Sequence, residues 1–179
     1  MEDRQKTKNR DLLEWYDALV FAVAALVLLF CFGARTVVVD GSSMLNTLVH
    51  GDRLLVQTGF YTPERGDVVV VDGYNGYGKP LVKRVIGVGG DTIDIDPDLG
   101  IVYRNGEPLA EPYTRDGVTL GTGDTVFPIT VPEGTLFLMG DNRQNSTDSR
   151  SSRVGCVDER DILGKVLLRI FPLNKFGRI

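Results

Sequence analysis

The sequence is poor in the residues from which most catalytic and metal sites are built. Among its 179 residues there is one histidine, His50, and there are two cysteines, Cys31 and Cys156. One histidine leaves little for a Ser-His-Asp triad or a histidine-based zinc site. Two cysteines are too few for a disulfide framework, so we interpret both as small apolar residues. Any catalysis must therefore use another base, and we expect no metal and no cofactor.

An excess of positive charge is also missing. The chain has 20 Lys and Arg residues against 24 Asp and Glu residues, a net charge of −4. Nothing in this balance indicates a nucleic-acid partner. Apolar residues make up 42% of the chain and charged residues 25%, which is typical of a globular core. The length fits one domain with a short appendage.

Long apolar runs are rare too, and one segment stands out. Residues 18–34, ALVFAVAALVLLFCFGA, contain no charged side chain. As a helix they would measure about 26 Å, against about 30 Å for a hydrocarbon core, and Trp15 and Tyr16 occupy the place of an interfacial anchor. The alternatives are a cleavable signal peptide, a buried core helix and a chance run, but the end of the run fits a cleavage site poorly. We predict a transmembrane anchor at residues 15–34.

The charges before this segment predict its orientation. The first ten residues, MEDRQKTKNR, hold four basic side chains and two acidic ones. The positive-inside tendency keeps such a tail in the cytoplasm. We therefore predict a cytoplasmic tail at residues 1–14, a single pass through the cell membrane, and an extracytoplasmic domain at residues 35–179.

The pattern after Arg35 is that of a β protein. Short Val-rich and Ile-rich segments such as TVVVD, DVVVVD and TLFLMG alternate with Gly, Pro, Asp and Asn, and helical periodicity is not sustained. Asn105-Gly106 is the pair favoured in a two-residue type I′ hairpin turn. We predict a mainly β fold, an antiparallel sheet or barrel, with a smaller β insertion at approximately residues 91–135.

The first segment with chemical potential is LVKRVIGVGGD, residues 81–91. Side chains alternate faces on a strand, so Lys83 would share a face with Leu81 and Val85. A lysine in apolar surroundings loses hydration, which lowers its pKa and allows it to act as a base near neutral pH. The alternative is an edge-strand lysine that points into water.

Two further segments are rich in polar groups. DGSSMLNTL, residues 40–48, holds two adjacent serines between apolar runs, and a serine hydroxyl needs a neighbouring base to act as a nucleophile. With one histidine in the chain, a neutral lysine is the best remaining candidate. GDNRQNSTDSR, residues 140–150, has no aliphatic side chain and is either a solvated loop with local turns or a bonded network. The side chains able to pair within it are Asp141, Arg143, Ser146, Asp148, Ser149 and Arg150.

These three segments together resemble bacterial type I signal peptidases. The order is Gly-x-Ser-Met-x-x-Thr-Leu, then Lys-Arg-Val-Ile-Gly-x-x-Gly-Asp, then Gly-Asp-Asn-Arg-x-x-Ser-x-Asp-Ser-Arg, and the similarity extends from Trp15 to Pro172. The resemblance implies a membrane-bound serine endopeptidase that removes signal peptides from exported preproteins. Its partners would be those signal peptides and membrane lipid.

The resemblance also implies roles for individual residues. Ser43, next to Met44, matches the nucleophile, whereas Ser42 does not, and Lys83 matches the general base. Ser146 matches the serine that orients the lysine amine. The backbone N–H of Ser43 would hold the oxyanion, and a second donor seen in some members is missing because its position is Gly41. The residues that match bracing positions around the site are Arg84, Asp141, Asp148 and Arg150.

Substrate preference would come from apolar walls that favour small residues at −1 and −3 of the signal peptide. The matching positions are Val37, Val39, Met44, Leu48 and Val82, for each of which core packing is the alternative. Two residues depart from the family pattern, because Asn46 and Gly89 stand where proline is usual. Proline stiffens a turn, so both changes are expected to loosen the loops around Ser43 and Lys83.

Two rival functions use the same residues. A Ser/Lys autoprotease of the kind found in SOS repressors would need a helix-turn-helix where residues 1–34 supply an apolar segment. A catalytically impaired, membrane-tethered β domain would bind exported chains without cutting them. A cleavage assay distinguishes this second rival from the peptidase.

Overall fold

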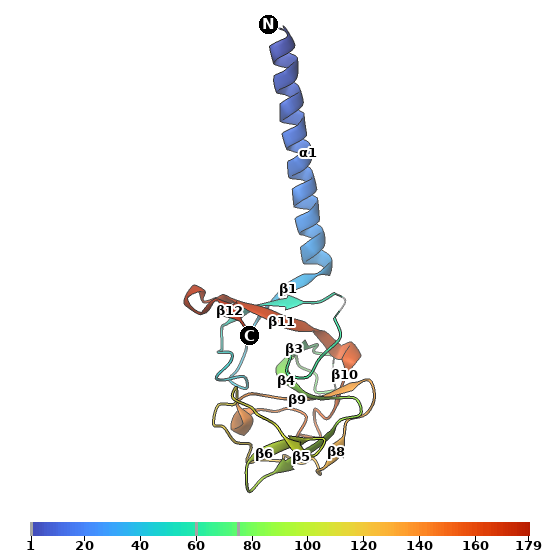
Figure 1. The fold of residues 1–179 in the computed structure, drawn as a ribbon, viewed down its shortest axis with the longest axis vertical. Helices are drawn as coiled ribbons and strands as arrows, with labels where there is room; N and C mark the ends of the chain where they lie inside the picture. The colour runs from blue at the N-terminus through green and yellow to red at the C-terminus, as the bar shows by residue number, and fades with distance from the viewer. Residues whose placement is uncertain (1, 60, 75) are drawn as a thin grey trace.

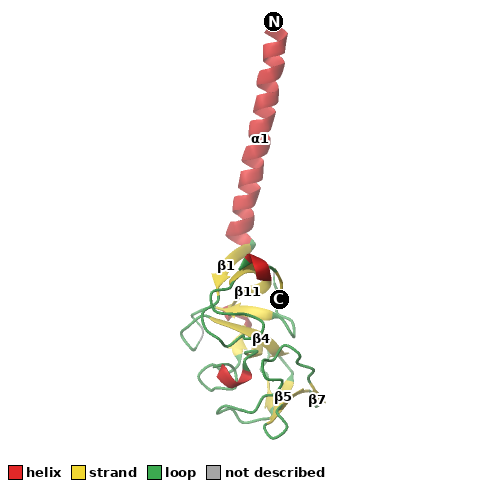
Figure 2. Ribbon diagram, turned by 90° about the vertical axis from the view of Figure 1, so that its left-hand side faces the viewer, coloured by secondary structure: helices red, strands yellow, loops and turns green. Residues whose placement is uncertain are grey.

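The computed structural model describes residues 2–59, 61–74 and 76–179, with the side chains of residues 2–12 and 29–32 left aside. A single long helix, α1 (Glu2–Phe32), projects from a β domain that contains the other described residues (Figure 1). Figure 2 shows the β domain as short strands joined by long loops. Three short 3-10 helices lie in those loops, η1 (Arg143–Asn145), η2 (Glu159–Asp161) and η3 (Leu173–Lys175).

The helix differs from the predicted anchor in its bounds. It extends back through the predicted tail to Glu2, and it ends at Phe32, so Gly33 and Ala34 lie outside it. Glycine is unfavourable in a helix, and the β-branched residues that follow favour a strand. Among the residues whose side chains are described, no helix combines the length and the apolar character of a membrane span.

The main sheet has eight strands and is antiparallel at each pairing. Its order is β1-β2-β11-β3-β4-β9-β10, with β12 paired to β11. The mainly β, antiparallel prediction is confirmed. The strands are β1 (Ala34–Val38), β2 (Arg53–Gln57), β3 (Val68–Val71), β4 (Leu81–Val88), β9 (Thr135–Met139), β10 (Val157–Asp158), β11 (Ile162–Phe171) and β12 (Gly177–Arg178).

A second, four-stranded sheet is built from the residues between β4 and β9. Its order is β7-β6-β5-β8, and it lies at the end of the domain away from α1 (Figure 1). Asn105 and Gly106, with φ of 57° and 83°, join β6 to β7. Positive φ at both positions is what a type I′ turn requires. The strands are β5 (Thr92–Asp96), β6 (Ile101–Arg104), β7 (Glu107–Pro108) and β8 (Ile129–Thr130).

The centre of the main sheet determines where Lys83 lies. β4 is paired on both sides, to β3 and to β9, so its backbone is fixed by two hydrogen-bond ladders. Lys83 stands opposite Val69 on β3, which belongs to the run of four buried valines, Val68–Val71. A lysine at this position is surrounded by strands on both sides instead of lying at an edge.

Candidate active site

Lys83 is buried and is hydrogen-bonded to Ser43. The residue is 2% exposed, and its Nζ donates to Ser43 Oγ at 2.8 Å and to the carbonyl oxygen of Val82 at 3.1 Å. The alternative of a lysine pointing into water is therefore wrong. Burial is the main reason that the pKa of Lys83 is lowered to about 8, because a dry environment penalises the charged ammonium.

Nearby charges reduce that effect. The carboxylates of Asp148 and Asp141 raise the pKa of Lys83, while the Arg150 guanidinium lowers it. Burial outweighs them, so the lysine loses its proton far more easily than an ordinary lysine with a pKa of 10.5. An amine with a pKa near 8 that contacts a serine hydroxyl can accept the hydroxyl proton.

The two adjacent serines have different surroundings. Both lie in the connection from β1 to β2, which Met44 and Leu48 anchor in an apolar core cluster. Ser43 Oγ faces Lys83, whereas Ser42 Oγ accepts a hydrogen bond from Asn145 Nδ2 at 2.9 Å. Geometry therefore assigns only one of the two hydroxyls to the lysine.

The 140–150 segment holds this serine connection by its main chain. Asn142 donates twice, from its backbone N–H to the carbonyl oxygen of Ser43 and from Nδ2 to that of Ser42, both at 2.9 Å. Asn142 is fully buried. The polar segment is thus hydrogen-bonded to the connection that carries Ser42 and Ser43. The alternative of a solvated loop is therefore wrong.

Two buried ion pairs brace the network. Arg84 grips Asp141 with two hydrogen bonds, Nε to Oδ1 at 2.9 Å and Nη2 to Oδ2 at 2.7 Å. Arg150 grips Asp148 in the same way, at 2.8 and 2.9 Å. The Oδ2 oxygen of Asp141 also accepts a hydrogen bond from the Thr47 hydroxyl. The four predicted bracing residues are therefore brought together around Ser43 and Lys83.

Asp148 remains ionised inside this network. Burial alone would raise its pKa, but the hydrogen bonds and the charge of Arg150, together with the hydrogen bond from the Gly140 N–H, lower it below the ordinary value. Ser146 Oγ itself is buried and makes no hydrogen bond of regular geometry with any described residue. It therefore lies beside the network without a bond to Lys83 in the described part of the chain.

Gly140 is the point where three parts of the site meet. A Cβ built on this residue would lie 2.7 Å from Ser146 Cβ and would overlap both Ser146 Oγ and the carbonyl oxygen of Ser43. Its N–H donates to Asp148 Oδ2 at 3.0 Å. Only glycine allows the 140–150 segment to approach the serine connection this closely.

We predict that Gly140→Ala lowers catalytic activity by about 10-fold to 100-fold, because misplacing reacting groups by about 1 Å costs rates of this order. The added methyl must push Ser43 and Ser146 apart. The measurement is kcat/KM, with folding checked by circular dichroism. Gly177→Ala is the matched control, since a Cβ there meets nothing within 4 Å. Equal activity of both variants would show that the segment yields without disturbing Ser43.

A cavity of about 490 Å³ opens beside Ser43 and Lys83, and we call it the Ser43 cavity. Four of the five predicted wall residues, Val37, Val39, Met44 and Val82, line it. Leu48 does not, because it is fully buried in the core below. The lining residues that sequence reasoning missed are Val38, Asp40, Val70, Tyr77, Lys79, Pro80 and Leu81.

A signal for part of this missing wall was present in the sequence. Tyr77, Lys79 and Pro80 come just before the lysine strand, in the connection from β3 to β4. Because β3 and β4 pair as neighbours, their connection has to lie near one end of the lysine strand. The pattern of apolar residues did not indicate this part of the wall, since Tyr77, Lys79 and Pro80 lie outside the Val-rich and Ile-rich segments.

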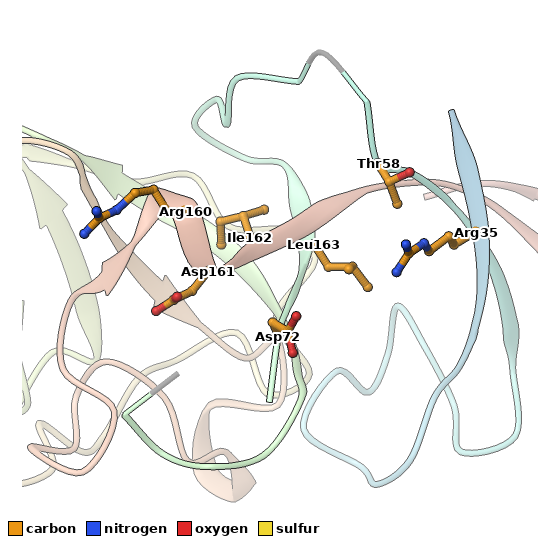
Figure 3. Close-up of a pocket in the computed structure, with 7 residues that line it drawn as sticks. All are labelled: Arg35, Thr58, Asp72, Arg160, Asp161, Ile162 and Leu163. Atoms are coloured by element: carbon orange, nitrogen blue, oxygen red, sulfur yellow. The ribbon is translucent and has the colours of Figure 1, made fainter. Parts of the chain in front are cut away.

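A second pocket, of about 290 Å³, is separate from this site. Figure 3 shows Arg160 and Arg35 at opposite ends of the stretch formed by Ile162 and Leu163. Arg160 is paired with Asp158 at 2.6 Å. None of the predicted site residues lines this pocket, so the Ser43 cavity is the candidate active site. The residues that line the second pocket are Arg35, Thr58, Asp72, Arg160, Asp161, Ile162 and Leu163.

The positions that depart from the family pattern have specific neighbours. Asn46 Nδ2 donates to the carbonyl oxygen of Thr114 at 3.4 Å. A Cβ on Gly89 would lie 2.9 Å from Glu133 Cα, so a larger residue there would require the Glu133 turn to move. Gly41 has a φ of 109°, which favours glycine, and its N–H donates to His50 Nδ1 at 3.3 Å.

Comparison with known proteins identifies a family and several similar chains. The family described as signal peptidase, peptidase S26, matches residues 12–171. Signal peptidase I of Bacillus licheniformis is 39% identical, covering 99% of this chain and 98% of the relative. Signal peptidase I T of Bacillus subtilis (strain 168) is 40% identical, covering 97% and 93%. A crystal structure of a signal peptidase I from Enterococcus faecalis V583 matches with 29% identity and a TM-score of 0.48, covering 59% of this chain and 97% of that one.

The family match spans most of the chain, and the relatives are matched over nearly their whole length. The resemblance found in the sequence motifs is therefore confirmed. The chain belongs to the signal peptidase family, peptidase S26, and is a type I signal peptidase within it.

Proposed function

We propose that this peptidase removes N-terminal signal peptides from exported preproteins with Ser43 as nucleophile and Lys83 as general base. The observation that carries the proposal is the 2.8 Å hydrogen bond between Lys83 Nζ and Ser43 Oγ, made by a lysine that is 2% exposed. Its relatives are named signal peptidase I, which supports the substrate class.

The reaction divides into two steps. Ser43 Oγ attacks the carbonyl carbon of the scissile peptide bond while Lys83 Nζ takes the hydroxyl proton. The lysine then gives this proton to the leaving amine, and the signal peptide remains as an acyl ester on Ser43. Water, deprotonated by the same lysine, hydrolyses the ester and regenerates the serine.

Charge that develops on the carbonyl oxygen needs a donor. We assign this role to the backbone N–H of Ser43, and one such donor contributes about 3 to 4 kcal/mol in comparable sites. The ion pairs of Arg84 with Asp141 and of Arg150 with Asp148 brace the site without direct chemistry. Ser146 is the residue proposed to orient the Lys83 amine, by way of its buried hydroxyl.

Substrate preference follows from the walls of the Ser43 cavity. Val37, Val39, Met44 and Val82 present small, mostly branched apolar surfaces, and such walls favour alanine-sized side chains at −1 and −3 by excluding larger ones. An extended signal peptide would add its backbone beside a strand. Leu48 acts from behind this wall, as core support for Met44.

We also propose that α1 attaches the enzyme to the cell membrane, with the N-terminus in the cytoplasm and the β domain outside. The described part of α1 exposes large apolar side chains, including Trp15 at 78%, Phe21 at 76% and Leu19 at 60%. Apolar surface of this extent favours lipid as a neighbour. The partners are then membrane lipid and the signal peptides held in it.

The test is cleavage of a purified preprotein with an Ala-x-Ala site between pH 6 and pH 10. A base must be neutral, so wild-type kcat should rise with pH through the pKa of Lys83, about 8. The neutral fraction grows from about 1% at pH 6 to nearly all at pH 10. Lys83→Ala should be inactive throughout. A folded wild type that binds signal peptides without cutting them would instead support the impaired binding domain.

A further inference from the structure

Arg143 is a buried cation whose counterion comes from the connection between two strands of the second sheet. Its side chain is 1% exposed, and it binds Glu111 with two hydrogen bonds, Nη1 to Oε2 at 2.7 Å and Nη2 to Oε1 at 2.6 Å. Its Nη1 also donates to Thr119 Oγ1 at 2.6 Å. Glu111 lies in the connection that follows β7 of the second sheet. A buried guanidinium is stable only when paired in this way.

This cation supports the part of the site that touches the serine. Arg143 Nε donates to the carbonyl oxygen of Gly140 at 3.0 Å. Gly140 is the residue that lies against the Ser43 carbonyl and Ser146. Hydrogen bonds therefore connect Glu111 to Arg143 and Arg143 to Gly140, the residue that lies against Ser43.

Tyr113 makes a second connection from the same segment. Its ring centroid lies 4.0 Å from the Arg84 guanidinium carbon, and its hydroxyl donates to Glu111 Oε1 at 2.8 Å. A cation over an aromatic face is attracted and oriented by the ring. Arg84 in turn holds Asp141, so Tyr113 acts on the brace directly beside Lys83.

The backbone of this stretch, which we call the 111–115 segment, follows the catalytic network closely. The Arg115 N–H donates to the carbonyl oxygen of Asp141 at 3.0 Å, and the Thr114 carbonyl accepts from Asn46 Nδ2 at 3.4 Å. Four separate contacts thus join the 111–115 segment to the surroundings of Ser43 and Lys83. Their partners are Arg143, Arg84, Asp141 and Asn46. None of them touches the Ser43 cavity, whose lining comes from other residues.

We propose that Glu111 and Tyr113 are positioning residues of the peptidase reaction, which hold Arg143 and Arg84 so that the 140–146 segment keeps Ser43 against Lys83. The inference rests on the proposed function. The second sheet then has a task in the reaction although it supplies no reacting atom.

The test compares Glu111→Gln with Glu107→Gln in the full-length enzyme. Glu107 is an exposed carboxylate on β7 of the same sheet. Glu111→Gln should lower kcat by about 10-fold or more, because the reacting groups Ser43 and Lys83 are displaced from each other. KM should stay within about 2-fold of the wild type, because the walls that bind the substrate are unchanged. Glu107→Gln should match the wild type.

A second readout separates positioning from simple stability. The groups that act on Lys83 are Asp148, Asp141 and Arg150, with burial as the largest influence. Loosening the 140–146 segment admits water, so the pKa of Lys83 should rise toward its ordinary value. Competitive acetylation of Lys83 across pH, followed by mass spectrometry, measures this without substrate, so it remains informative even if the wild type cuts no preprotein.

The outcomes are distinct. A lower melting temperature with unchanged kcat and an unchanged Lys83 pKa would overturn the proposal, and a downward pKa shift would show that Glu111 acts by charge alone. If Glu111→Gln fails to fold, Tyr113→Leu decides, with Tyr74→Leu as its control because that tyrosine is 93% exposed. Tyr113→Leu with the kcat and Lys83 pKa of the wild type would likewise overturn the proposal.

Discussion

Ser43→Ala should abolish preprotein cleavage, whereas Ser42→Ala should leave most of it. Only the Ser43 hydroxyl lies against Lys83 Nζ, at 2.8 Å. Removing the nucleophile of a coupled catalytic set costs rates of about 10⁴-fold to 10⁶-fold. The Ser42 hydroxyl instead accepts from the exposed Asn145 amide, and loss of a neutral, exposed hydrogen bond has a small effect. We expect Ser42→Ala to retain activity within about 3-fold.

The two variants are matched by design, since they remove the same atom from adjacent residues. Cleavage is measured with one preprotein and one detergent, and folding is compared by thermal unfolding. Substantial activity in Ser43→Ala would remove Ser43 from the nucleophile's role. Loss of activity in Ser42→Ala alone would make Ser42 the nucleophile. The connection from β1 to β2 would then have to change conformation so that the Ser42 hydroxyl reaches Lys83.

Lys83→Met should destroy activity and stabilise the fold. The fall in the pKa of Lys83 from 10.5 to about 8 corresponds to about 3 kcal/mol at 1.36 kcal/mol per pK unit. This penalty is fully present below about pH 8, where the folded protein must carry a buried ammonium. It disappears as the pH rises from about 8 to 10.5, because the lysine is then neutral in both states. Loss of the hydrogen bond to Ser43 offsets about 1 kcal/mol.

The net gain expected at pH 7 is therefore about 2 kcal/mol in the free energy of unfolding, measured by denaturant titration. The advantage of the variant over the wild type should shrink between pH 8 and pH 10.5. Lys165→Met is the control, because this half-exposed lysine on β11 is paired with Asp67 at 2.6 Å and its removal should bring no gain. A destabilised Lys83→Met would mean that the site holds its lysine at no cost to the fold.

Local patterns in the sequence predicted the strands and a candidate lysine, and the resemblance to a known family supplied the roles of the site residues. Alternation along a strand placed Lys83 among apolar neighbours, and its burial in the structure agrees. The valine-rich runs predicted strands, which the structure contains at Val68–Val71 and elsewhere. Such features depend on a few neighbouring residues and the period of a strand, which are visible without knowing the fold.

Features that depend on distant pairing were not predictable. Arg143 was expected to pair within its own polar segment, but its carboxylate partner is Glu111, which lies 32 residues earlier in the connection between β7 and β8. No local pattern sets the register between two sheets. Leu48 does not line the Ser43 cavity for a related reason. Its place in a motif put it near Ser43, but the turn of the chain directs its side chain into the core.

The order of strands in the main sheet has a consequence for when the enzyme becomes active. The serine connection follows β1 and leads into β2, the lysine lies on β4, and between β2 and β3 sits β11, from near the end of the chain. A growing polypeptide that has not yet released residues 162–171 cannot bring β2 and β3 into one sheet. The strand that follows the serine connection and the strand that carries the lysine therefore share one sheet only when residues 162–171 are present. We expect no activity from a chain that lacks this segment.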